Sequence, residues 1–127
     1  MSANFAPNCL TFLADAAISK GMAVKLGSDR EHVLKGAANT NKCIGIALNA
    51  TTAAEDAVEV ALPGAGAKGL LGETVSAGDS LVCHTDGTLV KPNTIGDILI
   101  AVAMEDGVAG DIIGVHVIRG HAAVADQ

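Results

Sequence analysis

One pattern occurs twice along the chain, and this repetition limits the possible folds more than any other feature. Residues 18–26 read ISKGMAVKL, and residues 75–83 read VSAGDSLVC. Each stretch has a β-branched residue, then Ser-x-Gly, then an apolar-rich run. The later parts match too, as IGIAL at 44–48 and IAVAM at 100–104, and as alternating stretches ending in glycine at 58–64 and 114–120.

The spacing between the two copies is nearly constant. Gly78 follows Gly21 by 57 positions, and Gly120 follows Gly64 by 56. The register therefore holds to within one residue across half the chain. We predict two degenerate copies of one β-rich unit, over about residues 18–64 and 75–120.

Turn chemistry begins each copy. Glycine adopts backbone conformations that other residues resist, and serine bonds locally to the backbone. We therefore assign structural turns to Ser19 and Gly21, and to Ser76 and Gly78. Asp86-Gly87 lies between apolar runs, which is a strong signal for a hairpin.

The apolar pattern then predicts the strands. The runs 43–48 and 98–104 are almost continuously apolar, which indicates strands buried on both faces. The closing stretches alternate, which indicates one covered face and one wet face. The glycine-rich run 64–69 has the composition of a flexible crossover between the copies.

These patterns predict an all-β fold, a small β-barrel or β-sandwich built from two degenerate repeats with an extended N-terminal arm. Residues 1–13 form the arm and a first strand, and residues 14–127 form a single β domain. Residues 9–13 (CLTFL) can pair as a strand with their own sheet or with another chain.

Composition and charge exclude several classes of protein. The chain has 127 residues, of which 50% are apolar, so it is not disordered. Its net charge of −6 and its lack of a basic cluster argue against direct nucleic-acid binding. No apolar run approaches the ~20 residues that span a bilayer. The first eight residues carry no Lys or Arg, so they do not resemble a signal peptide, and we expect synthesis in a cytoplasm.

The sequence predicts no metal site, cofactor or catalytic set. Cys9, Cys43 and Cys83 are odd in number and widely spaced, which favours buried free thiols. No two cysteines have the close spacing of a structural zinc site, and we expect His116 and His121 to lie across the end of a strand and the start of the tail, so they are not neighbours on one face. The run 64–69 contains Lys68 but lacks the Ser or Thr and the helix of a nucleotide-binding loop.

Paired carboxylates recur in the two copies, as Glu55-Asp56 and Glu105-Asp106. Acidic loop tips are more often solubilising than catalytic. We therefore expect a protein that is not an enzyme.

Several stretches, in this order, resemble the tailed-phage capsid decoration (cement) proteins, a family often mislabelled as RecA/RadA-like recombinases. They are LTFLA at 10–14, ISKGMAVKL at 18–26, IGIA at 44–47, VEVALPG at 58–64 and VSAGD at 75–79. The resemblance covers roughly residues 9–120. It implies a small β protein on the outer surface of a phage head, assembled in the host cytoplasm.

The resemblance also implies the partners. Such proteins clamp neighbouring major capsid subunits, and many form homotrimers, although dimers occur. The extended arm suits strand addition to a shell protein. The candidate capsid-binding residues are Asn4, Phe5, Pro7, Leu10 and Phe12.

Two other functions stay open. One is a soluble binding module, for example a carbohydrate-binding β-sandwich on a virion or spike, although only Phe5 and Phe12 offer rings for stacking on sugars. The other is a small β-barrel enzyme related to sugar-acid dehydratase and antifreeze-like domains, which would need a cleft containing an ionisable group with a shifted pKa.

Overall fold

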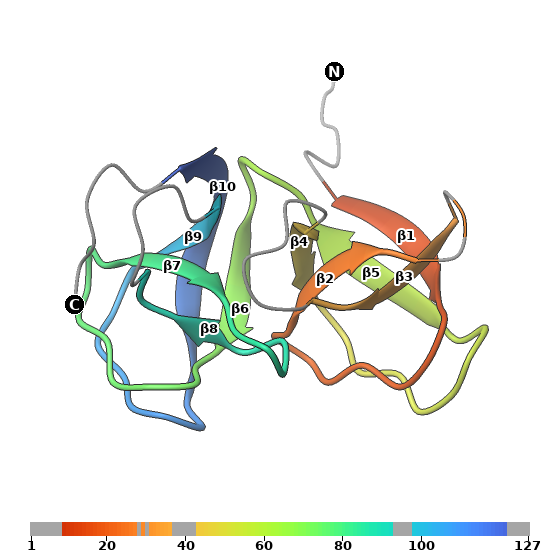
Figure 1. The fold of residues 1–127 in the computed structure, drawn as a ribbon, viewed down its shortest axis with the longest axis horizontal. Helices are drawn as coiled ribbons and strands as arrows, with labels where there is room; N and C mark the ends of the chain where they lie inside the picture. Colours follow the sequence, from red (N-terminus) through yellow and green to blue (C-terminus); the bar gives the residue numbers. More distant parts are fainter. Residues whose placement is uncertain (1–8, 28, 30, 37–42, 93–97, 122–127) are drawn as a thin grey trace, which may run out of the picture.

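The computed structural model describes residues 9–27, 29, 31–36, 43–92 and 98–121, and all its regular elements there are β-strands (Figure 1). The prediction of an all-β fold is confirmed. The strands are β1 (Cys9–Ala14), β2 (Ala23–Leu26), β3 (His32–Lys35), β4 (Cys43–Ala47), β5 (Ala57–Ala61), β6 (Gly66–Leu70), β7 (Ser80–Cys83), β8 (Leu89–Val90), β9 (Ile98–Ala103) and β10 (Ile112–His121).

The first five strands form a closed barrel in the order β1-β3-β2-β4-β5. β1 pairs antiparallel with β5 from Cys9↔Ala61 to Leu13↔Ala57, and it closes the barrel through a short parallel pairing with β3. The predicted strand at residues 9–13 thus pairs with its own sheet. The buried interior consists of Ala14, Ile18, Val24, Val33, Ala47, Val58 and Val60.

The last five strands repeat this arrangement. Their order is β6-β10-β9-β7-β8, which matches the barrel when it is read from β1 through β5, β4 and β2 to β3. An isolated parallel bridge, Leu71↔Leu89, joins the two edges of this sheet. It lies where Ala14↔Val33 lies in the barrel.

The interiors of the two halves correspond residue by residue. All seven interior residues of the barrel have a counterpart 55 to 57 positions later in the second core, namely Leu71, Val75, Leu81, Leu89, Ala103, Ile113 and Val115. The backbone hydrogen bonds correspond too. Gly21 N–H donates to the Ala47 carbonyl at 2.9 Å, and Gly78 N–H donates to the Ala103 carbonyl at 2.8 Å. The fold is therefore one β unit used twice.

The two halves share a continuous core. Ala23, Cys43, Ile46 and Ala61 of the first half belong to the same buried cluster as the interior of the second half. β4 is accordingly buried on both faces, as its unbroken apolar run predicts, because Ala47 points into the barrel while Cys43 and Ile46 face the other half.

Hydrogen bonds also cross between the halves. Leu70 N–H donates to the Gly21 carbonyl at 3.0 Å, and Ala23 N–H donates to the Gly87 carbonyl at 2.9 Å. The Arg119 guanidinium donates through Nη1 to the Cys43 carbonyl at 2.8 Å. These bonds fix how the halves sit side by side, with β6 next to β4 (Figure 1).

The expected flexible crossover at residues 64–69 is wrong. Residues 66–70 form β6, which pairs with β10 over five residue pairs, so only a tight turn around Pro63 and Gly64 connects the halves. The glycine-rich composition suggested flexibility, but Gly69 is needed for close packing inside the sheet. A methyl group on Gly69 would lie 2.5 Å from Cδ1 of Leu89, so a larger residue does not fit.

The described residues include no helix long and apolar enough to cross a membrane.

Candidate functional site

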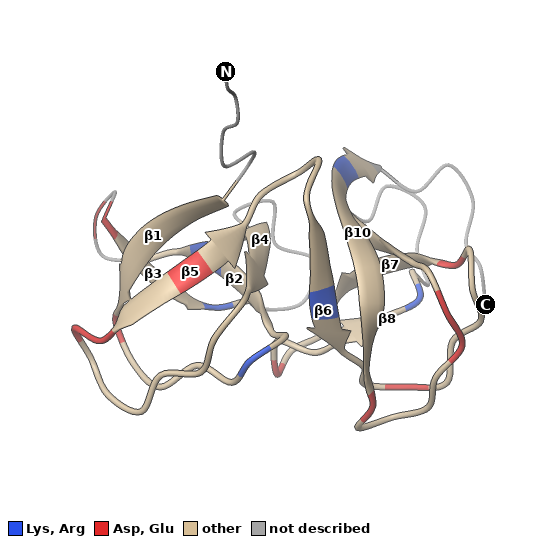
Figure 2. Cartoon of the chain, turned by 180° about the vertical axis from the view of Figure 1, so that it is seen from behind, with Lys and Arg blue, Asp and Glu red and all other residues tan. Residues whose placement is uncertain are grey.

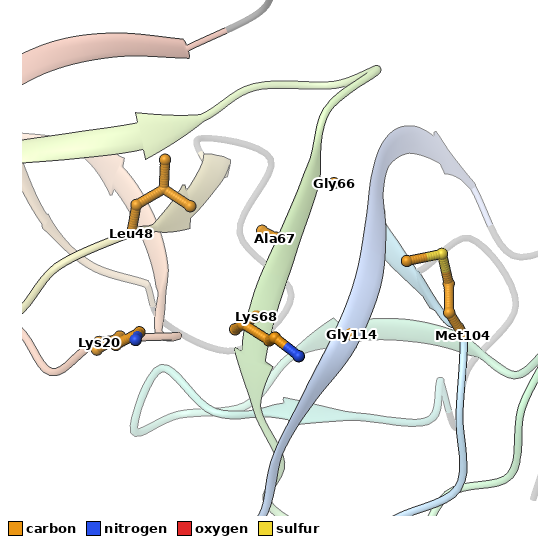
Figure 3. A pocket seen from close by; sticks show the side chains of 7 residues that line it. All are labelled: Lys20, Leu48, Gly66, Ala67, Lys68, Met104 and Gly114. Atoms are coloured by element: carbon orange, nitrogen blue, oxygen red, sulfur yellow. The ribbon is translucent and has the colours of Figure 1, made fainter.

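A cleft of about 480 Å³ opens between the two halves of the molecule (Figure 3). Lys20 and Leu48 reach it from the first half, and Met104 and Gly114 from the second. β6 runs between these two sides and contributes Gly66, Ala67 and Lys68.

The floor of the cleft is the outer face of β6, where two small residues leave the space open. A methyl group on Gly66 would have the Val115 carbonyl oxygen, 4.0 Å away, as its nearest contact. Ala67 packs against the core below. At Gly66 the strand therefore presents its backbone to the cleft, and no side chain of the described residues fills the space there.

The apolar walls occupy equivalent positions in the two copies. Leu48 follows β4 and Met104 follows β9, 56 positions later. Leu48 N–H donates to the Glu59 carbonyl at 2.8 Å, and Met104 N–H donates to the Gly114 carbonyl at 2.9 Å. Met104 is 57% exposed, the highest value among the large hydrophobic side chains of the described residues.

Two lysines border the cleft in a protein that is otherwise acidic. Lys20 and Lys68 are both exposed, and neither forms an ion pair with any carboxylate in the described part of the chain. Acidic residues lie mostly in loops (Figure 2), and Glu59 is the only described one within a strand. The nearest acid to Gly114 is Glu105, whose Oε2 accepts the Gly114 N–H at 2.7 Å.

The lining of the cleft combines apolar carbon with two positive charges. Its seven residues supply two lysine ammonium groups, a thioether, aliphatic carbon and backbone. Elsewhere among the described residues, no three His, Cys, Asp or Glu side chains gather where they could hold a metal ion.

Of the candidate capsid-binding residues, Leu10 and Phe12 do not line this cleft. Asn4, Phe5 and Pro7 lie outside the described residues. Leu10 lies on β1 and is 55% exposed, while Phe12 is half-buried and packs against the barrel core.

The residues assigned to turns lie at the starts of β2 and β7 and in the β7–β8 hairpin. Gly21, Gly78 and Gly87 have φ angles of 89°, 93° and 88°. The Ser19 and Ser76 carbonyls accept the N–H groups of Met22 and Asp79 at 3.2 and 3.0 Å. Asp86 Oδ1 accepts the Thr88 N–H and hydroxyl at 3.0 and 2.6 Å, and these bonds lower the pKa of Asp86.

The acidic pairs are engaged within their own half. Asp56 Oδ2 accepts the Thr52 and Ala53 N–H groups, which lowers the pKa of Asp56. Asp106 Oδ1 accepts the Ala77 N–H at 2.8 Å. Glu55 binds Nε2 of His32 at 2.9 Å, and Asp29 binds Nδ1 of the same ring at 2.7 Å. These contacts, above all that with Asp29, raise the pKa of His32 to about 9.

The three cysteines are free, and Cys43 and Cys83 are buried. A methyl group on Gly36 would lie 2.5 Å from Sγ of Cys83 and 2.8 Å from Sγ of Cys43, so both sulfurs face one point between the halves. The contact with Cys43, together with burial, raises the pKa of the Cys83 thiol.

Sequence reasoning missed the cleft because its residues come from five separate segments. One signal was available: Leu48 and Met104 are apolar residues at matching ends of the buried strands, just before polar loops. That position places one apolar residue at the edge of each half, where the two copies face each other.

Comparisons with known proteins give a likeness of fold. No protein-family model matches the chain, and no curated protein matches its sequence. Among solved structures, the crystal structure of head fiber gp8.5 N base in bacteriophage phi29 is similar, with a TM-score of 0.66 and 21% identity. The match covers 87% of this chain and 92% of that one. The two proteins share a fold.

Proposed function

We propose that this chain is a virion structural protein that binds the outer surface of a phage head. In this role it decorates the shell and stabilises contacts between major capsid subunits, without catalysis. The observation that carries the proposal is the likeness of nearly the whole chain to the base of a phage head fiber.

The character of the molecule supports a binding role. Two copies of a small β unit share one core, and the cleft between them is apolar and positively charged. Attachment at many equivalent positions on a shell makes modest individual contacts sufficient. We propose a homotrimer on the head, with a dimer as the alternative state.

The N-terminal arm is the second part of this proposal. Residues 1–8, which include Asn4, Phe5 and Pro7, precede β1 in the sequence, and Leu10 on β1 is exposed. An extended segment can add a strand to a sheet edge of a shell protein, where main-chain hydrogen bonds supply affinity.

Co-sedimentation with heads tests the function. Heads are assembled without this chain from the genome that encodes it, mixed with purified protein, and pelleted. We expect saturable binding at a fixed number of copies per head, and weaker binding when residues 1–8 are removed. Protein that stays in the supernatant at all concentrations would refute the function, whereas full binding of the shortened chain would refute only the role of the arm.

A further inference from the structure

The cleft has the properties of a docking surface for one kind of partner. We propose that it binds an acidic segment of the phage head's surface protein. This segment places an apolar side chain between Leu48 and Met104 and a carboxylate beside Lys20 and Lys68. The inference rests on the proposed function and adds the chemistry by which the head is recognised.

The apolar part of the cleft provides the first argument. Met104 is 57% exposed although Ala103, the residue before it, is buried. Its apolar side chain therefore meets solvent at a cost in free energy that a partner's apolar group would remove. Methionine adapts its shape to different apolar contacts. Leu48 faces the same space from the other half (Figure 3).

The open floor provides the second argument. A methyl group added to Gly66 would lie 4.0 Å from its nearest contact among the described residues, the Val115 carbonyl oxygen. The other residues of β6 that line the cleft are Ala67 and Lys68. A partner side chain can therefore reach the backbone of β6 without displacing any group of this chain.

Charge complementarity identifies the partner's polar group. Lys68 lies next to Ala67 on β6, and Lys20 lies on the segment that precedes β2 (Figure 3). Neither lysine has an ion pair among the described residues. Glu105, at the Gly114 side, already accepts a backbone N–H. Two ammonium groups near one apolar cleft favour a carboxylate from outside.

A second copy of this chain is a poorer occupant. Most described carboxylates already accept hydrogen bonds from their own backbone: Asp29, Asp56, Glu73, Asp79, Asp86, Glu105, Asp106 and Asp111. A different protein supplies the carboxylate more readily.

Variants that change charge and shape separately test the inference. Lys20→Glu/Lys68→Glu reverses the charge of the cleft, while Gly66→Val projects a side chain suited to a strand into its open floor. Lys25→Glu/Lys35→Glu makes the same change in net charge on β2 and β3, outside the cleft. Circular dichroism and thermal melting establish that each variant is folded before its dissociation constant for heads lacking this chain is measured.

We expect the two cleft variants to bind heads at least about tenfold more weakly than the wild type, and the control to stay within about twofold. Lys20→Arg/Lys68→Arg should bind like the wild type, and added salt should weaken wild-type binding because the charges are exposed. Binding of Lys20→Glu/Lys68→Glu at wild-type strength, or a loss no larger than that of the control, would overturn the inference while leaving the proposed function intact. A changed oligomeric state with unchanged head binding would assign the cleft to a second copy and also overturn it. Failure of the wild type to bind heads would overturn both.

Discussion

His32 shows how single residues join parts of the barrel that are distant in sequence. Its ring bonds Asp29 in the β2–β3 connection at 2.7 Å and Glu55 in the β4–β5 connection at 2.9 Å. Glu55 adopts a φ of 72°, a strained value for a residue with a side chain. The equivalent residue of the second copy is Gly110, which has a φ of 90°. The first copy thus has a glutamate in the left-handed backbone conformation that glycine adopts at the equivalent position of the second copy.

We predict that stability depends on the charge of His32. The pKa of His32 rises from 6.5 to about 9 on folding, so its stabilising effect is complete below pH 6.5 and is lost as the pH rises through about 9. The pKa of Asp29 is lowered by folding. The stability that the Asp29 carboxylate contributes is therefore present above the ordinary pKa of 3.8 and is lost as the pH falls below that value. NMR titration of the His32 ring measures the pKa directly.

The control for this prediction is His32→Gln, which keeps a polar side chain without the charge. Denaturant titrations should show that the free energy of unfolding of the wild type exceeds that of this variant at pH 7, and that the difference disappears by pH 10. An advantage that is the same at both pH values, or a His32 pKa near 6.5, would contradict the account.

Gly36 marks a second place where a single atom matters. We predict that Gly36→Ala lowers the free energy of unfolding by about 1–3 kcal/mol, because its methyl group would overlap the sulfurs of Cys83 and Cys43. Gly120→Ala is the matched control, since a methyl group there meets no heavy atom within 4 Å, and its effect should be small. Chemical denaturation measures both, and equal effects of the two substitutions would show that the sulfurs do not fill this space.

The first strand of each half pairs within a sheet although its sequence shows little of the alternation typical of a strand. β1 and β6 are equivalent strands, because each pairs antiparallel with the last strand of its own half. Neither shows strong alternation, and β6 is rich in glycine. Both belong to their sheets because a neighbouring strand, β5 or β10, offers a pairing edge over five residues.

This pairing separates the arm from the barrel. We predict that removal of residues 1–8 leaves the protein folded, whereas removal of residues 1–13 unfolds it. The longer deletion removes most of β1, and with it the pairing to β5 from Cys9 to Leu13. Circular dichroism and thermal melting distinguish the two, and a folded protein lacking residues 1–13 would show that β1 is dispensable to the barrel.

The sequence predicts those parts of the fold that depend on local chemistry or on repetition. The Ser-x-Gly turns, the Asp86-Gly87 hairpin, the buried β4 and the alternating β5 and β10 all follow from residue type and spacing. The run 98–104 departs from its expected burial on both faces, because half of the residues of β9 are only partly buried and Met104 is exposed. Strand order does not, because loop length permits several pairings. β6 was also missed, since the close approach of Gly69 to Leu89 becomes visible only in three dimensions. The cleft was missed for the same reason, because it depends on how the two copies face each other.

At the scale of the whole molecule, the two halves form one cooperative unit. The core of the second half includes Ala23, Cys43, Ile46 and Ala61 from the barrel, and hydrogen bonds from Leu70, Ala23 and Arg119 cross between the halves. Separating the halves would expose this apolar surface and leave the crossing polar groups without partners.

We therefore predict a single unfolding transition for the full chain. Calorimetry should give equal calorimetric and van't Hoff enthalpies. Two resolved transitions would mean that each copy of the β unit is stable by itself.

We propose that this duplicated β protein is a component of a phage head's outer surface. A cryo-electron microscopy reconstruction of the virion whose genome encodes the chain tests it most directly. The account predicts density for two side-by-side β lobes at symmetry-related positions outside the shell, with the cleft between the lobes facing a capsid subunit. A virion whose outer surface has no density that fits this fold, at full occupancy of the major capsid protein, would contradict the claim.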